Sequence, residues 1–373
     1  MKKIKSVLTA TALTGALTFP IPLAQPALAD ANGTAAYGIE SADTSSRLTD
    51  LEVEPWIAES KWYPKYKNDP RVEFKQATSP AMNDRAVPLA VIPAKDPNRP
   101  TIYLLNGAGS GEQNTDWLTN SSVVDFYSEK NVNVVIPMSG AFSYYIDWLE
   151  EPVSGKYLQG PQKWETFLTQ ELPGAVEAEY NANGKRAIAG MSMAATSSLL
   201  LAEHNPEFYD AVGSFAGCAA TSSPLEYHAA GIVMGVDSGN IPEQENVRRM
   251  WGPQGSPSNV HQDALVNAEK LRGISTYVSA APGLLGETDL PSYLQANGME
   301  EITSYVQAYA VNALQGIPIE GAVNKCTHDF KAKMDSLGIP ATYNFRSVGV
   351  HNWAGWEEDL GKSWEVFGPA LNS

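Results

Sequence analysis

One serine lies between a run typical of a buried strand and a run typical of a helix. Ser192 is at the centre of Gly190-Met-Ser-Met-Ala194, after the apolar run 187–190 and before the helical pattern of 194–204. Small residues two positions before and two after the serine allow a tight strand-to-helix turn, which exposes the hydroxyl at the start of the helix. This context favours a nucleophile elbow over a chance match.

A serine hydroxyl becomes an effective nucleophile when a histidine accepts its proton. His351 lies in Gly349-Val-His-Asn-Trp353, directly after a strand-like run over 341–345 and near the C-terminus. That place fits the chain order of serine, acid and histidine in α/β-hydrolases. The remaining histidines are interpreted as helix or loop residues outside the site: His204, His228, His261 and His328.

The acid of such a triad is not fixed by spacing. Several carboxylates follow the predicted strand 276–280 and precede His351, and the candidates are Glu287, Asp289, Glu300, Glu301 and Glu320. Most of them must be ordinary surface carboxylates, so spacing alone leaves the choice open.

The elements that would position these residues alternate along the chain. Short apolar runs that stop at Gly or Pro indicate buried strands at 72–76, 87–92, 100–105, 132–136, 187–190, 276–280 and 341–345. Helices are expected at 122–130, 164–179 and 194–204. Alternation of this kind predicts an α/β fold with a mostly parallel central sheet and helices on both faces. We assign 72–373 to one catalytic domain and 30–71 to an N-terminal extension.

Composition and the N-terminus restrict partners and compartment. The 373 residues are 43% hydrophobic and carry a net charge of −16, so a disordered chain is excluded and nucleic acid is disfavoured as a partner. Lys2, Lys3 and Lys5 precede an apolar run and a small-residue site, which predicts a signal peptide (residues 1–29) cleaved after Ala29. We expect a secreted or envelope-associated protein with no membrane span, and its acidity disfavours binding to anionic lipid heads.

The chain has two cysteines, Cys218 and Cys326. In an oxidising compartment the pair predicts one disulfide, which would stabilise the fold by roughly 4 kcal/mol in the chain-entropy model. Two buried free thiols are the alternative. No metal site is expected, because the histidines show no ligand spacing among themselves or with the cysteines.

Several motifs resemble those of the mycolyltransferases, the secreted enzymes of actinobacteria that carry mycolic acids. They occur in the family's order over roughly 72–369: Tyr103-Leu-Leu-Asn-Gly107, Ile146-Asp-Trp148, Lys163-Trp-Glu-Thr-Phe-Leu168, Gly190-Met-Ser-Met-Ala194, Met250-Trp-Gly-Pro253 and Gly349-Val-His-Asn-Trp353. Alanine at the fifth elbow position is also the family's habit. The N-terminal extension and the cysteine pair resemble the corynebacterial branch more than the mycobacterial one.

The resemblance implies the α/β-hydrolase fold and a role for each site residue. It makes Ser192 the nucleophile, His351 the base and Glu320 the acid. It places the oxyanion hole at the backbone N–H groups of Ala108 and Met193.

It also implies substrates and sugar contacts. Asn106 and Trp353 are expected to bind substrate. The mycobacterial pattern has Asp at the position of Asn106 and Arg at that of Gly109, so the acceptor is left open. The implied donor is trehalose monomycolate, the implied acceptor is a sugar hydroxyl of trehalose mycolate or arabinogalactan or a protein hydroxyl, and no cofactor is needed.

Two other functions remain open from the sequence. A secreted carboxylesterase of the same fold would use the same triad with water as the acceptor. A non-enzymatic envelope or adhesion protein would be indicated by a degenerate triad, whereas all three positions here hold competent residues.

Overall fold

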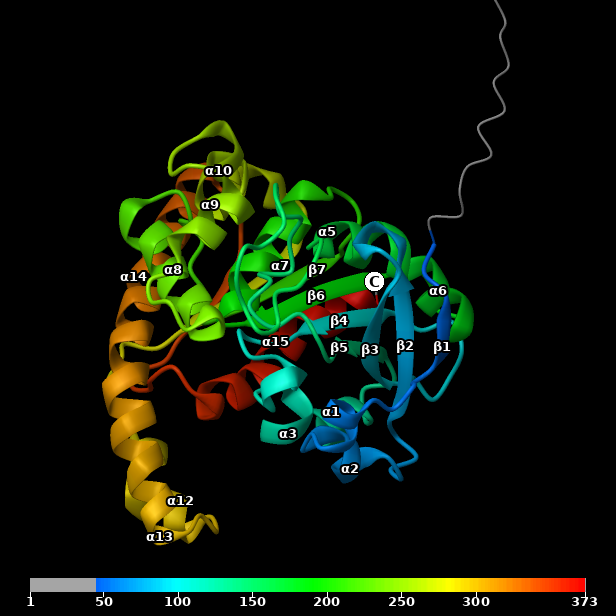
Figure 1. The fold of residues 1–373 in the computed structure, drawn as a ribbon, viewed down its shortest axis with the longest axis horizontal. Helices are drawn as coiled ribbons and strands as arrows, with labels where there is room; N and C mark the ends of the chain where they lie inside the picture. The colour runs from blue at the N-terminus through cyan, green and yellow to red at the C-terminus, as the bar shows by residue number, and fades with distance from the viewer. Residues whose placement is uncertain (1–44, 373) are drawn as a thin grey trace, which may run out of the picture. The chain divides into compact units, whose positions relative to one another are not determined.

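A nine-stranded, mostly parallel sheet runs through the computed structural model, which describes residues 45–372 (Figure 1). The strands lie in the order β1-β2-β3-β5-β4-β6-β7-β8-β9, with antiparallel pairing from β1 to β5 and parallel pairing from β5 to β9. Their bounds are β1 Leu48–Asp50, β2 Glu73–Ser79, β3 Arg85–Ile92, β4 Thr101–Leu105, β5 Asn133–Pro137, β6 Arg186–Met191, β7 Ala211–Phe215, β8 Ser275–Ala280 and β9 Thr342–Phe345.

The predicted fold class and all seven predicted strands are confirmed. Strands β4, β5 and β7 are buried along their whole length, as expected for parallel strands covered on both faces. Two strands were not predicted. Strand β7 reads Ala-Val-Gly-Ser-Phe and has one β-branched residue, and β1 is a three-residue edge strand that pairs with β2.

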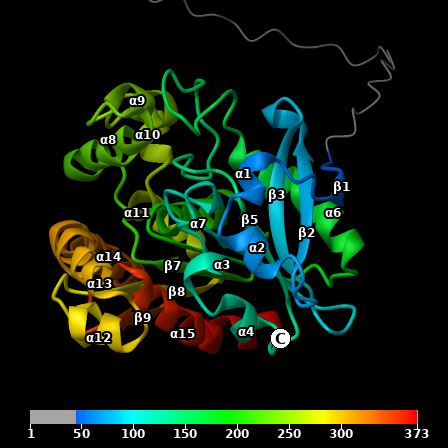
Figure 2. The same cartoon turned by 60° about the horizontal axis from the view of Figure 1, so that its bottom comes forward.

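Successive side chains of the strands point to opposite faces of the sheet and enter two separate cores. Leu89, Tyr103 and Ile188 pack in one core, and their neighbours along the strands pack in the other. Residues of α6, α7, α8 and α14 complete the first core, and residues of α2, α3, α4 and α15 complete the second. Helices α15 and α4 lie side by side over the second face (Figure 2).

The α-helices have the bounds α1 Pro55–Ala58, α2 Trp62–Tyr66, α3 Trp117–Asn120, α4 Val123–Tyr127, α5 Trp164–Thr166, α6 Leu172–Glu179, α7 Met193–His204, α8 Pro224–Ser238, α9 Gln244–Trp251, α10 Pro257–His261, α11 Ala264–Asn267, α12 Pro291–Ala296, α13 Glu301–Tyr305, α14 Ile317–Leu337 and α15 Trp353–Leu371. Shorter 3-10 turns are η1 Pro80–Met82, η2 Gly111–Gln113, η4 Ala268–Leu271 and η5 Glu287–Asp289, and two π-helical stretches are η3 Phe167–Glu171 and η6 Val306–Gly316. The three predicted helices are present, and 164–179 is continuous through η3.

The predicted domain boundary at Val72 falls between α2 and β2. Elements on both of its sides belong to one compact unit, because β1 pairs with β2 and Trp62 is fully buried in the core. The predicted signal peptide and its cleavage site lie outside the described residues. Among residues 45–372, no helix combines the length and the apolar character needed to cross a membrane.

Candidate active site

The sharp turn at Ser192 is built by close packing of small residues. Strand β6 ends at Met191, α7 begins at Met193, and Ser192 between them has φ 55° and ψ −121°. A Cβ added to Gly190 would lie 2.6 Å from the Cβ of Ala194, so only glycine fits there. The Ser192 N–H donates to the Phe215 carbonyl at 2.9 Å. The strained conformation is therefore held by strand and helix together, and the predicted elbow is present.

A continuous chain of hydrogen bonds joins Ser192, His351 and Glu320. The distance from His351 Nε2 to Ser192 Oγ is 2.8 Å, and that from His351 Nδ1 to Glu320 Oε2 is also 2.8 Å. A carboxylate only accepts, so Nδ1 carries the proton and Nε2 is free to accept the serine proton. His351 comes from the loop after β9, and Glu320 comes from the first turn of α14. The structure thus brings together the three residues expected to form the triad.

Glu320 is fully buried and held by two further groups. Its Oε1 accepts a hydrogen bond from the Ala281 N–H at 2.6 Å and lies 3.9 Å from Arg346 Nη2. Arg346 Nη1 is 3.0 Å from Asp359 Oδ1, which is also fully buried. Burial opposes the charge of Arg346, yet the carboxylates of Asp359 and Glu320 raise the pKa of Arg346 above its usual value. A fixed cation therefore stands beside the candidate acid.

Arg346 and Asp359 were not among the site residues predicted from the sequence. Asp359 accepts hydrogen bonds from Tyr277 and Ser279 of β8, each at 2.7 Å, so the pair is tied to the sheet. The available signal was a single arginine at the end of the predicted strand 341–345. Its partners, Glu320 and Asp359, lie on α14 and α15, and a local sequence pattern does not predict ion pairs between separate elements.

The loop after β4 lies against the elbow. A Cβ built on Gly107 would be 3.6 Å from Ser192 Cβ, in van der Waals contact. The next residue, Ala108, accepts a hydrogen bond from Phe142 at 2.7 Å through its carbonyl. At the other side, Met193 is the first residue of α7, where backbone N–H groups have no partner within the helix.

Comparisons with known proteins show which family this chain belongs to. The Esterase family matches residues 79–364. Diacylglycerol acyltransferase/mycolyltransferase Ag85A of Mycobacterium leprae is 30% identical over 298 residues, which cover 78% of this chain and 80% of that protein. Ag85A of Mycobacterium tuberculosis is 29% identical over 296 residues, which cover 78% of this chain and 78% of that protein. This chain is a member of the mycolyltransferase family.

Solved structures support the fold of this mycolyltransferase. Mycobacterium tuberculosis MPT51 (FbpC1) matches with a TM-score of 0.60 and 21% identity, over 80% of this chain and 98% of that one. An S-formylglutathione hydrolase from Agrobacterium tumefaciens matches with a TM-score of 0.56 and 15% identity, over 81% of this chain and 96% of that one. At these identities the likeness concerns the fold, an α/β-hydrolase fold. The corynebacterial branch stays a prediction.

Asn106 does not face the site. Its side chain is fully buried, donates to the Pro137 carbonyl at 2.8 Å and accepts from the Trp117 N–H at 3.0 Å. Both amide atoms have partners within the protein and the side chain is buried, so Asn106 fixes the loop here, and its expected contact with substrate stays a prediction. A Cβ on Gly109 would overlap the side chains of Thr115 and Gln113, so neighbouring side chains already fill the place where the mycobacterial pattern has arginine.

Trp353 lies beside His351 and is half-buried. Its ring packs edge-on against Trp117 and Trp356, with centroid distances of 5.5 Å and 5.2 Å. It also lines an open depression whose other lining residues are mostly polar: Lys65, Tyr66, Thr119, Asn120, Ser121, Ser122, Asp125, Ala354 and Glu357. The lining of this depression, which includes neither Ser192 nor His351, is therefore mostly polar, with the indole of Trp353 as one of its walls.

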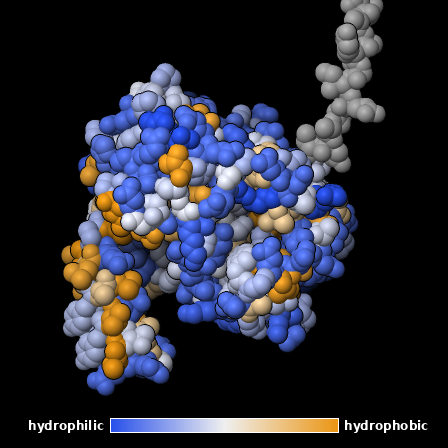
Figure 3. Space-filling model, viewed as in Figure 1, coloured by the Kyte–Doolittle hydropathy of each residue, from blue (hydrophilic) through white to orange (hydrophobic). Residues whose placement is uncertain are grey.

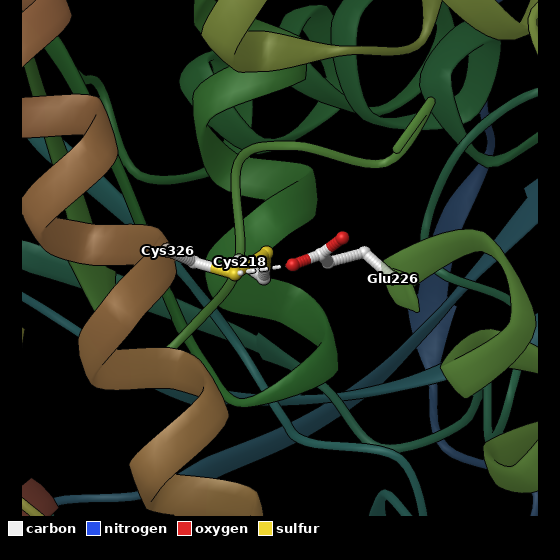
Figure 4. Close-up of side chains that lie close together, drawn as sticks. All are labelled: Cys218, Glu226 and Cys326. Carbon is white, nitrogen blue, oxygen red and sulfur yellow. Dashed lines mark hydrogen bonds between the residues drawn. A yellow bond between two sulfur atoms is a disulfide. The ribbon is translucent and has the colours of Figure 1, made fainter. Parts of the chain in front are cut away.

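The predicted disulfide between Cys218 and Cys326 is present (Figure 4). It ties the loop after β7 to the middle of α14, the helix that carries Glu320. The Glu226 Oε1 lies 3.4 Å from Cys326 Sγ. Cys218, Cys326 and Glu226 are close enough to hold a metal ion in principle, but sulfurs that are bonded to each other are not thiolate ligands.

Proposed function

We propose that this mycolyltransferase acts outside the cytoplasm and moves a mycolyl group from trehalose monomycolate to another hydroxyl group through an ester on Ser192. The observation that carries the proposal is the hydrogen-bonded order Glu320, His351, Ser192 at a strand-to-helix elbow. Relatives named mycolyltransferases supply the substrate class.

In the first half-reaction, Ser192 Oγ attacks the ester carbonyl while His351 Nε2 takes its proton. The tetrahedral oxyanion is stabilised by the N–H groups of Ala108 and Met193, which flank the serine from the loop and from α7. His351 then gives the proton to the leaving trehalose hydroxyl, and a mycolyl ester remains on Ser192.

In the second half-reaction, His351 removes a proton from the incoming hydroxyl, which attacks the mycolyl ester. The proton returns to Ser192 as the ester breaks, so the enzyme is restored without a net change. Glu320 holds the imidazole in the required tautomer and stabilises the imidazolium that forms at each step. The ester donor is already activated for serine chemistry, so the cycle needs no cofactor.

The acceptor is a sugar hydroxyl or a protein hydroxyl of the cell envelope. The depression lined by Trp353 supports a sugar, because an indole with the Asp125 and Glu357 carboxylates and the Asn120 amide nearby suits a polyhydroxylated ring. We propose Trp353, which the sequence also predicts to bind substrate, as a contact of the acceptor. Because Asn106 and Gly109 do not provide the mycobacterial side chains, we assign acceptor recognition here to residues of that depression.

A carboxylesterase is the second candidate, since the Esterase family matches most of the chain. The same groups would hydrolyse the acyl ester if water reached it. The products of the donor alone and of the donor with acceptor therefore separate the two functions.

The test uses purified protein and its Ser192→Ala variant, each incubated with trehalose monomycolate. We expect dimycolate or another transferred ester, and an acyl adduct on Ser192 in mass spectra of the wild type only. Ser336→Ala, an exposed serine at the end of α14, is the matched control and should leave the products unchanged. Free mycolic acid alone would assign hydrolysis, and absence of product and adduct would reject the proposal.

The same proposal includes export and maturation. A signal peptide cleaved after Ala29 would release a protein that starts at Asp30, with the extension 30–71 ahead of the catalytic domain. N-terminal sequencing of protein from the culture medium and envelope fractions tests this, and a start at Met1 would contradict it.

A further inference from the structure

Between β8 and α14 the chain leaves the sheet and forms an arm, which we define as residues 282–316. It contains η5, α12, α13 and η6, and it projects from the end of α14 (Figure 1). Its two ends meet at the base, where Leu284 pairs with Gly349 and a Cβ on Gly283 would lie 2.6 Å from the Ile317 carbonyl oxygen. The arm is thus a projection with a fixed base.

The arm exposes an unusual share of apolar side chains. Of the nineteen large hydrophobic residues exposed in the described chain, nine lie within the arm. The most exposed are Ile302 at 80%, Leu314 at 75% and Tyr309 at 59%. Figure 3 shows apolar surface gathered along the projection that α12 and α13 form. Patches of this kind mark interaction surfaces.

Two faces of the arm's last helix differ sharply. Ser304, Ala308, Asn312 and Gly316 recur every four residues, are buried or small, and face the protein. The apolar residues lie between them and face solvent, with the rings of Tyr305 and Tyr309 stacked at 6.1 Å. The outer face is therefore an amphipathic surface with tyrosines, which suit a boundary between water and lipid.

Charge restricts what this face can contact. No lysine or arginine occurs between Arg272 and Lys325, whereas Glu287, Glu300 and Glu301 are exposed. Attraction to anionic headgroups requires basic residues near the surface, and here the local charge is negative. A partner that matches both properties is apolar and uncharged, such as a layer of neutral glycolipid.

The arm is joined to the triad through one continuous helical path. Gly316, the last residue of η6, accepts a hydrogen bond from the His351 N–H at 3.2 Å through its carbonyl. A Cβ on Gly316 would lie 3.2 Å from Val350, so the helix is packed closely on the histidine loop. Four residues later the same path carries Glu320.

We infer that the outer face of the arm docks the enzyme on a neutral glycolipid layer, the aggregated state of the donor in water. This inference rests on the proposed function for the identity of the lipid, although binding itself needs no turnover. Docking by apolar contact would hold the enzyme at the layer from which the donor is drawn, through an arm whose base contacts the histidine loop. Each side chain that leaves water adds to binding in proportion to its apolar area.

Binding is tested by flotation with phosphatidylcholine vesicles that contain trehalose dimycolate, in the Ser192→Ala background so that lipid is not consumed. The arm variant Ile302→Gln/Tyr309→Gln/Leu314→Gln should lose binding by about tenfold or more. The control variant Leu149→Gln/Val153→Gln/Val266→Gln removes three exposed apolar residues elsewhere and should bind like its parent. Binding should persist in high salt and should not increase with phosphatidylglycerol in place of the glycolipid.

Activity separates docking from chemistry. Hydrolysis of soluble p-nitrophenyl butyrate should be equal in the arm variant and the wild type, which also shows that the variant is folded. Transfer from vesicle-bound trehalose monomycolate should fall by about tenfold in the arm variant only. Equal flotation of arm variant and parent would overturn the docking inference and leave the proposed function intact. Arm-dependent flotation without any mycolate turnover would overturn the function and leave docking intact.

Discussion

The nucleophile and the acid of this site are held in different ways. Ser192 belongs to the elbow between β6 and α7, where β7 is buried along its whole length and β6 is buried from Ala187 onward. Glu320 belongs to α14, which follows a projecting arm and is tied back by the disulfide, by Arg346 and by the Ala281 N–H. The serine is held by close packing of the strands and helix around it, whereas the acid is held by a disulfide, an ion pair and a hydrogen bond. The two sides should therefore fail in different ways when perturbed.

The largest expected effect is on the acid side. Glu320→Gln keeps the size of the side chain but removes the carboxylate that accepts the His351 Nδ1 proton, so the required tautomer is no longer favoured. We expect kcat/KM for a soluble ester to fall by about 10⁴-fold with little change in thermal unfolding. Glu226→Gln, near the disulfide but outside the hydrogen-bonded chain, is the control. Near-normal activity of Glu320→Gln would assign the acid elsewhere.

Removal of the disulfide should weaken the attachment of α14. The double variant Cys218→Ser/Cys326→Ser frees a chain segment of 108 residues between the bridged positions, which lowers the free energy of unfolding by about 4 kcal/mol. Denaturant titration measures this loss. Reductant should bring the wild type to the variant's midpoint and leave the variant unchanged; coincident midpoints without reductant would show that the bridge contributes nothing.

Replacing glycine with alanine should lower the free energy of unfolding at the elbow of Ser192 and raise it in α14, the helix of Glu320. Gly190→Ala places a Cβ 2.6 Å from Ala194, so we expect a loss of about 3 kcal/mol in stability and loss of activity. Gly321→Ala, inside α14 with nothing within 4 Å of its added Cβ, should gain about 0.5 kcal/mol from helix propensity. Chemical denaturation of both variants checks the contrast, which equal losses would remove.

A pH-dependent effect that leaves both the acid and the nucleophile in place concerns Glu112, in η2 after the oxyanion loop. Burial raises its pKa to about 7, although the N–H groups of Ala141 and Gly140 partly oppose the shift. The unfolded chain releases this proton near pH 4.5, so the folded state loses stability as the pH rises from there through 7. Glu112→Gln should remove this loss. The free energy of unfolding of the variant minus that of the wild type should therefore be about 2 kcal/mol larger at pH 8 than at pH 5.

Unfolding titrations at both pH values measure this difference. A difference that does not change between pH 5 and pH 8 would contradict the assignment to Glu112.

The nucleophile side was largely predictable from the sequence. Buried β-branched runs reveal strands locally, and the elbow combines a strand end, small residues and a helix start within a few positions. Strand β7 was missed because its sequence, Ala-Val-Gly-Ser-Phe, carries a weak β signal even though both of its faces are buried. Burial of that kind depends on neighbours and not on the strand's own residues.

The acid side was less predictable. Spacing left five carboxylates, and only the family resemblance selected Glu320, which the structure places against His351. The Arg346–Asp359 pair and the arm joined to α14 depend on contacts between elements distant in sequence. The burial of Asn106 was not predictable for the same reason, because its partners Pro137 and Trp117 lie outside its own segment.

The closed base of the arm has an evolutionary consequence. The chain departs beside Gly349 and returns beside Gly283, so residues between these points can be inserted, deleted or exchanged without a shift in strand register. Length variation among relatives should therefore concentrate between 285 and 315, while the elbow and the histidine loop keep their spacing. One catalytic core could in this way be fitted to envelopes of different lipid composition by replacement of a single surface segment.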